Sequence, residues 1–285
     1  MRARFGFFDM SILSVSLAGI FAFPLGAYAQ NGTNPNMVPE IEQQQNTNQQ
    51  LEQRTLEKNT PAPKVDPKEE AAYKAFYESS ASEPDARIKL GEDFLQKYPA
   101  SRYAESVDAG LTHSYFAKQD WKNFYASADK ALALNPDDPG VLVILGWVIP
   151  HSMKSDDPNA LSNLDKAEKY EKHAIEILGT MPKPDGMTDE QFAQHKAAFL
   201  AQAHSGLGLV YFRRQQFDDS VKELQQATQA SAPPDPTDLF VLGIDLQNLN
   251  RFADAADAFN RCAQISGGLQ DRCKQSADAA KKQVR

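Results

Sequence analysis

Residues 201–227, AQAHSGLGLVYFRRQQFDDSVKELQQA, and residues 236–262, PTDLFVLGIDLQNLNRFADAADAFNRC, carry the same pattern of residue types. Each stretch contains Leu-Gly, a bulky residue three positions after the Gly, and then an aromatic, a small, a bulky and a small residue. The matching pairs are Leu207/Leu242, Gly208/Gly243, Tyr211/Leu246, Phe217/Phe252, Ser220/Ala255, Leu224/Phe259 and Ala227/Cys262. Leu145-Gly146 with Ile149 begins a third copy. A period of about 34 to 35 residues is the signature of a repeat architecture, in which neighbouring units stack to bury a shared core.

This pattern resembles the tetratricopeptide repeat, a unit of two antiparallel helices. The copies lie at 105–138, at 139 onward with about nine extra residues between Pro150 and Asn163, at 201–234 and at 236–269, and a degenerate copy lies at 69–99. The first of them carries Leu111, Tyr115, Trp121, Ala131 and Asn135-Pro136 at the motif's places. The resemblance implies an all-α, right-handed superhelical solenoid over residues 68–285, with four to five hairpins and a C-terminal capping helix.

Apolar periodicity and breaker residues predict eleven helices from residue 66 onward. Their expected ranges are 69–79, 83–98, 101–118, 120–134, 141–149, 161–178, 188–215, 217–229, 236–249, 252–265 and 269–284. We expect Pro150 to end the fifth of these helices, because proline removes a backbone donor. Thr188 and Gln191 form a capping box that predicts the start of the long seventh helix. No segment has the alternating pattern of a strand.

The first 29 residues have the layout of a secretory signal peptide. Arg2 and Arg4 precede an apolar run, and Ala27-Tyr28-Ala29 offers a cleavage site. The run is too short for a typical spanning helix, although an uncleaved anchor is the alternative. Residues 30–67 are rich in Asn and Gln and then in Pro, which predicts a disordered arm and a stiff linker, with a weak coiled coil near 41–56 as the alternative. We therefore expect an exported protein, periplasmic or else secreted, with no membrane span after cleavage.

Net charge, histidine spacing and the absence of catalytic motifs argue against several classes of function. The formal net charge of −8 argues against nucleic-acid binding, which needs a basic face. The five histidines, His113, His151, His173, His195 and His204, form no pair at metal-ligand spacing. The chain contains no HExxH, P-loop, GxGxxG or GxSxG motif. The sequence thus predicts a protein that is not an enzyme and uses no cofactor or metal.

The two cysteines, Cys262 and Cys273, are equally distant from Gly267-Gly268, the expected turn between the last two helices. Residues equidistant from a tight antiparallel turn lie opposite one another, and an exported protein can keep a disulfide. We predict a Cys262–Cys273 bond. The alternative is two free thiols, with Cys262 as a small core residue in the place of the motif's alanine.

In tetratricopeptide solenoids the first helices of successive repeats line a concave groove. The resemblance places on this groove His113, Phe116, Trp147, His151, Leu209, Phe212, Arg213, Phe240, Ile244, Gln247 and Asn248. It implies an interaction scaffold that binds a protein or peptide. Alternatively, these residues belong to the core, and the protein is an accessory subunit of an envelope enzyme or transport assembly, tethered or oligomerised by its N-terminal arm. The irregular stretch 150–203 is the second candidate binding surface.

Overall fold

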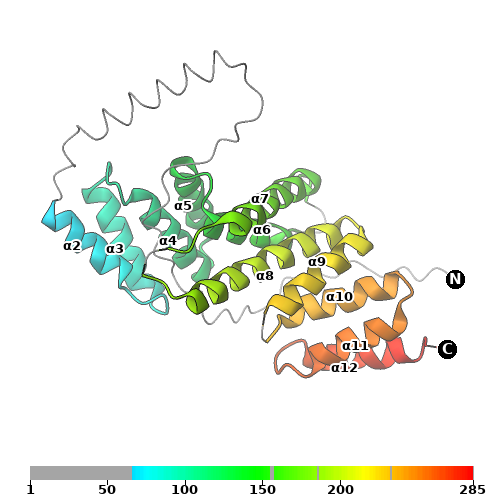
Figure 1. Ribbon diagram of the computed structural model, residues 1–285. Helices are drawn as coiled ribbons and strands as arrows, with labels where there is room; N and C mark the ends of the chain where they lie inside the picture. The colour runs from blue at the N-terminus through cyan, green and yellow to red at the C-terminus, as the bar shows by residue number, and fades with distance from the viewer. Residues whose placement is uncertain (1–65, 155–156, 185, 232, 285) are drawn as a thin grey trace, which may run out of the picture.

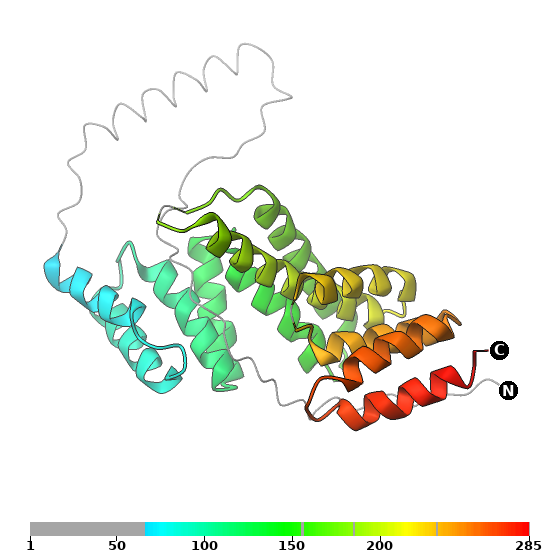
Figure 2. The same ribbon diagram turned by 60° about the horizontal axis from the view of Figure 1, so that its bottom comes forward.

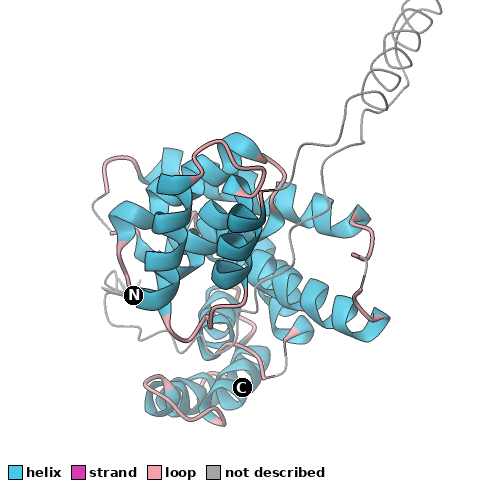
Figure 3. Cartoon of the chain, turned by 90° about the vertical axis from the view of Figure 1, so that its left-hand side faces the viewer, coloured by secondary structure: helices cyan, strands magenta, loops and turns pink. Residues whose placement is uncertain are grey.

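The computed structural model describes residues 66–154, 157–184, 186–231 and 233–284. They form an array of helices, with no strand among them (Figure 1 and Figure 3). The helices are α2 (Pro67–Tyr77), α3 (Pro84–Lys97), α4 (Ala104–Ala117), α5 (Trp121–Leu134), α6 (Pro139–Ser152), α7 (Ala160–Thr180), α8 (Asp189–Arg213), α9 (Phe217–Ala230), α10 (Pro236–Asn248), α11 (Phe252–Ala263) and α12 (Gln270–Lys281). In this part of the chain, consecutive helices pair as five hairpins and α12 follows alone, which confirms the predicted all-α array with a terminal helix.

The helices begin within three residues of the predicted positions. Among the described helices, five starts have a side-chain cap. Asp66, Asp138 and Asp235 each precede a proline at the first helical position, and each side chain accepts a bond from a backbone N–H of the first turn. The predicted capping box of Thr188 and Gln191 starts α8. The predicted signal peptide 1–29 and all but the last two residues of the predicted arm 30–67 lie outside the described residues.

Three hairpins share the same turn, which shows the repeat directly in the backbone. Gln119, Gln215 and Asn250 follow α4, α8 and α10 with φ of 56°, 60° and 60°. In each case the next residue's N–H donates to a carbonyl five residues back, as Gln216 does to Tyr211 at 2.9 Å. The left-handed residue itself donates three residues back, as Gln215 does to Phe212. This is the Schellman arrangement, in which glycine usually occupies the left-handed position.

Replacing Gln215 with Gly should therefore raise the free energy of unfolding by up to about 1 kcal/mol. The left-handed backbone costs an L-residue about 1–2 kcal/mol, and the extra entropy of an unfolded glycine offsets about half of the gain. Thermal melts measure the effect. Gln216→Gly is the matched control, because Gln216 has a φ of −88°, so glycine relieves no left-handed strain there. Equal shifts in both variants would contradict the role of the turn.

Inside three of the hairpins (α6–α7, α8–α9 and α10–α11), a glycine of the first helix faces a larger residue of the second. A Cβ placed on Gly208 would lie 2.6 Å from Leu224, and one on Gly243 would collide with Phe259. Gly146 of α6 has the same relation to α7, but the residue facing it is Glu171, at 2.5 Å from such a Cβ. The Leu-Gly pattern is thus explained by close helix contacts.

Helix α6 is enclosed on all sides, since every residue from Pro139 to Pro150 is buried. Its sequence is apolar all round, which is the pattern of a fully buried helix. The prediction that Pro150 ends this helix is wrong, because the helix continues to Ser152. Pro150 lies in the last turn, where its missing N–H removes a single intrahelical bond, and burial of the surrounding side chains outweighs that loss.

The first half of α8 helps to enclose α6. Phe199 and Leu200 pack against a buried cluster that contains Leu142 and Val143 of α6 and Leu178 of α7. Contacts of α8 extend to α6, α7, α9 and α10. The long helix therefore links the α6–α7 hairpin to the α10–α11 hairpin, and Figure 1 and Figure 2 show its path from two sides.

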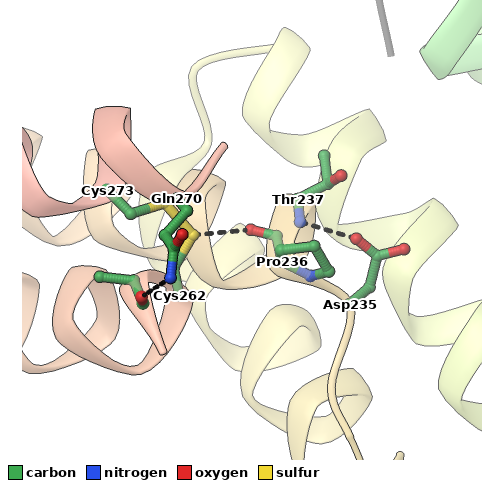
Figure 4. The surroundings of a disulfide bond; sticks show 7 residues. Asp235, Pro236, Thr237, Cys262, Gln270 and Cys273 are labelled. Carbon is green, nitrogen blue, oxygen red and sulfur yellow. Dashed lines mark hydrogen bonds between the residues drawn. A yellow bond between two sulfur atoms is a disulfide. The ribbon is translucent and has the colours of Figure 1, made fainter. Parts of the chain in front are cut away.

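The disulfide between Cys262 and Cys273 joins α11 to α12 (Figure 4), which confirms the predicted pairing. Their Cα atoms lie 5.8 Å apart, within the usual range for a disulfide. Both residues are fully buried beside Leu239 of α10. The sulfur of Cys262 also lies 3.3 Å from the carbonyl oxygen of Pro236. The bond therefore fixes α12 to α11, with both sulfur atoms buried beside α10.

Candidate functional site

The predicted groove residues divide into two sets. The N-terminal set is largely core: Trp147 is 6% exposed and Leu209 is 1% exposed, so neither is available to a partner. For these two side chains the alternative interpretation holds, in which the predicted groove residues belong to the core. The reason is packing between helices: Trp147 belongs to the buried cluster of α2–α6, and Leu209 of α8 belongs to the buried cluster of α8–α12.

His113 and Phe116 of α4 are partly buried. Burial lowers the pKa of His113 below its ordinary value, and its Nδ1 atom is enclosed without a hydrogen-bond partner. The Phe116 ring lies edge-on to Trp147, with centroids 6.0 Å apart, and to Trp121, with centroids 6.1 Å apart. Trp121 is 41% exposed and is the most exposed of these three rings.

The C-terminal set remains accessible, and we call it the α8–α10 surface: Phe212, Arg213, Phe240, Ile244, Gln247 and Asn248. Asn248 is exposed, and the other five are partly buried. Phe212, Phe240 and Ile244 pack against the buried cluster of the last hairpins while keeping part of their surface open. The Arg272 guanidinium of α12 lies 5.2 Å from the centroid of Phe240. Two residues of the α8–α10 surface are aromatic and one is an arginine, residue types that are enriched at protein interfaces.

A buried polar network, which the sequence analysis did not find, connects three first helices. Trp147 Nε1 donates to Ser205 Oγ at 3.2 Å, and Ser205 Oγ donates to Asp238 Oδ1 at 2.6 Å. Burial raises the pKa of Asp238 well above its ordinary value, and the charge of Asp235 adds to this effect. The sequence does contain one indication of this network: Asp238 is a charged residue next to the apolar stretch that begins at Leu239.

His151 is also placed by Trp147. Its Nδ1 lies 2.6 Å from the Trp147 carbonyl oxygen, which can only accept, so Nδ1 carries the proton. The ring centroids of the two residues are 3.6 Å apart. Burial lowers the pKa of His151 to about 4. At neutral pH the imidazole is therefore uncharged and acts as a packing group.

The irregular stretch contains a cavity of about 600 Å³. It lies where α5, the end of α6 and the start of α7 meet, and its lining residues are Tyr125, Ile149, Ser152, Met153, Lys154, Asp157, Pro158, Asn163 and Lys166. Asn163 Nδ2 donates to Asp157 Oδ2 at 2.9 Å, which holds the loop against α7. The extra residues of this repeat thus line a cavity beside α5, α6 and α7, away from the α8–α10 surface.

Within the described ranges, no three His, Cys, Asp or Glu side chains come together as a metal site. No helix in this part of the chain is long and apolar enough to cross a membrane.

No protein-family model matches the sequence, and no curated protein does. Among solved structures, a thermophilic TPR protein of Thermus thermophilus matches with 16% sequence identity and a TM-score of 0.47, over 75% of this chain and 99% of that one. On its own geometry, with five hairpins, repeated left-handed turns and glycine contacts between paired helices, the described chain is a tetratricopeptide-like helix array.

Proposed function

We propose that this protein is a protein–protein interaction scaffold of the cell envelope that holds a partner segment on the α8–α10 surface. The observation that carries the proposal is the partial exposure of Phe212, Phe240 and Ile244. Phe212 and Phe240 can bury a large apolar area when a partner covers them, and aromatic side chains contribute strongly to interface energetics. The neighbouring Gln247 and exposed Asn248 supply the polar rim.

Two features support a location in the envelope. The predicted signal peptide would export the chain, and the Cys262–Cys273 disulfide suits an oxidising compartment. Such a scaffold needs no cofactor, and its partner is a protein or peptide. We expect it to act by holding a partner in place.

The test compares partner capture by the full-length protein and by variants of the α8–α10 surface. Phe240→Ala removes an aromatic anchor, and Asn248→Arg adds bulk and charge at an exposed position. We expect each variant to reduce capture at least about tenfold, since hot-spot truncations cost about 2 kcal/mol or more. Quantitative affinity purification from envelope extracts identifies the partner, and titration with that purified partner measures the change.

Leu134→Ala is the control, because Leu134 is 59% exposed at the end of α5, outside the α8–α10 surface. Melting curves establish that every variant is folded. Unchanged binding by Phe240→Ala and Asn248→Arg would refute the proposal. Loss of capture only when residues 30–66 are deleted would instead support an accessory subunit tethered by its N-terminal arm.

A further inference from the structure

Glu171 occupies a position that the repeat reserves for an apolar side chain. It lies on α7 opposite Gly146, as Leu224 lies opposite Gly208 and Phe259 opposite Gly243. Glu171 is 0% exposed, and neither carboxyl oxygen has a hydrogen-bond partner. A second glycine, Gly206 of α8, also contacts the carboxyl, and a Cβ there would collide with Oε1. The carboxyl is therefore enclosed where α6, α7 and α8 meet.

Among the described residues, no cation compensates this carboxyl. Titratable groups close to it along the three helices bond elsewhere: His151 of α6 to the Trp147 carbonyl, Glu168 of α7 to Lys172 and Arg214, and His204 of α8 to Glu223. Burial alone raises the pKa of Glu171 well above its ordinary value, with no contribution from a neighbouring charge. An unpaired buried carboxylate is costly, so the folded state requires the protonated form.

We propose that Glu171 is a proton-operated latch between the α6–α7 hairpin and the α8–α9 hairpin. While the carboxyl keeps its proton, α6, α7 and α8 pack closely around it. When the proton leaves, the charge must reach water, and these three helices separate locally. The junction lies between the enclosed helix α6 and the α8–α10 surface, so proton loss loosens the link between the two halves of the array.

Two other carboxyls at contacts between hairpins, those of Asp245 and Glu105, also bind their protons more tightly in the folded protein. Their loss of a proton should therefore also lower stability as the pH rises. Ser220 Oγ lies 2.6 Å from Asp245 Oδ2 and 2.8 Å from the Gly208 carbonyl, and its single proton can serve only one of them. A protonated Asp245 satisfies both contacts, and burial raises its pKa to about 7. Glu105 lies beside Asp138 at the start of α6, and burial, together with that second carboxyl, raises the pKa of Glu105 to about 8.

The sign of the pH effect follows from linkage. The folded protein binds the Glu171 proton more tightly than the unfolded chain does. Its contribution to stability is complete below the ordinary glutamate pKa of about 4.5 and declines as the pH rises towards the folded value. Stability should therefore fall between about pH 5 and pH 8.5, in the opposite direction to ordinary acid unfolding.

Urea unfolding of the full-length protein at about pH 5, 7 and 8.5 tests the latch. We compare wild type with Glu171→Gln, which keeps the shape and cannot ionise, and with Glu171→Leu, which restores the residue type of the other repeats. The folding equilibrium constant of the wild type, divided by that of either variant, should fall about tenfold per pH unit within the titration window. Glu176→Gln, a change on the same helix, should leave this ratio constant.

A ratio for Glu171→Gln and Glu171→Leu that stays constant across this pH range would overturn the proposal. Hydrogen exchange of the wild type, corrected for intrinsic rates, gives a second readout that does not depend on the variants. Protection in α6–α8 should fall with rising pH more steeply than protection in α11 and α12. Equal changes in the two regions would show a global effect and no latch.

Discussion

Replacing Gly208 with Leu is expected to lower the free energy of unfolding by about 1–3 kcal/mol. The new side chain would start 2.6 Å from Leu224, a buried residue that the α8–α9 contact holds in place. Neither helix can retreat easily, because α8 also packs against α6, α7 and α10. Urea unfolding monitored by circular dichroism measures the loss.

Gly268→Leu is the matched control for this prediction. A Cβ on Gly268 meets no atom within 4 Å, so the change should leave stability within about 0.5 kcal/mol of wild type. A Gly208→Leu protein as stable as the control would contradict the close contact between α8 and α9, and with it the assignment of the Leu-Gly pattern.

Reduction of the Cys262–Cys273 bond should cost roughly 2–3 kcal/mol of unfolding free energy. The bond closes a loop across a sequence separation of 11 residues and thereby restricts the unfolded chain. The effect should be strongest in α12, whose buried side chains are small: Cys273, Ala277 and Ala280. Melting curves with and without reductant measure the change.

The double variant Cys262→Ala/Cys273→Ala controls for the reductant itself. It should melt at the same temperature in both conditions, because it has no bond to lose. Wild-type protein whose melting temperature does not respond to reductant, while intact mass shows two free thiols, would argue that the bond adds nothing to stability.

The helix array could be predicted from the sequence because the residues that determine helix starts and helix contacts act locally. The capping box at Thr188 and the glycines at 208 and 243 each specify one helix start or one helix contact. The Asp-Pro pairs at 66 and 138 also mark helix starts, but the prediction placed those starts two residues later, at 69 and 141. The cysteine pairing could also be predicted, since a tight antiparallel turn places equidistant residues together. These inferences need no knowledge of distant parts of the chain.

The site was harder to predict because it depends on which surfaces distant helices cover. Trp147 and Leu209 have the residue types and spacing of a groove, yet neighbouring helices bury both. Trp147 lies in the cluster of α2–α6 and Leu209 in that of α8–α12. Glu171 was missed for a related reason: its charged sequence neighbours are typical of a solvated helix face, although Gly146 and Gly206 enclose it. Phe240, Ile244 and Asn248 stay accessible because, among the described helices, only α12 follows the α10–α11 hairpin.

Because α8 contacts four other helices, the C-terminal end of the described array should resist local unfolding more than the α2 end. In a regular solenoid each unit contacts only its neighbours, so opening can start at either end and move inward. Here α8 binds four other helices into one block, and the disulfide ties α12 to the hairpin before it. The α2–α3 hairpin has neither support. While Glu171 keeps its proton, partial unfolding should therefore run in one direction, from α2 towards α6, so that the α8–α10 surface is the last part to open.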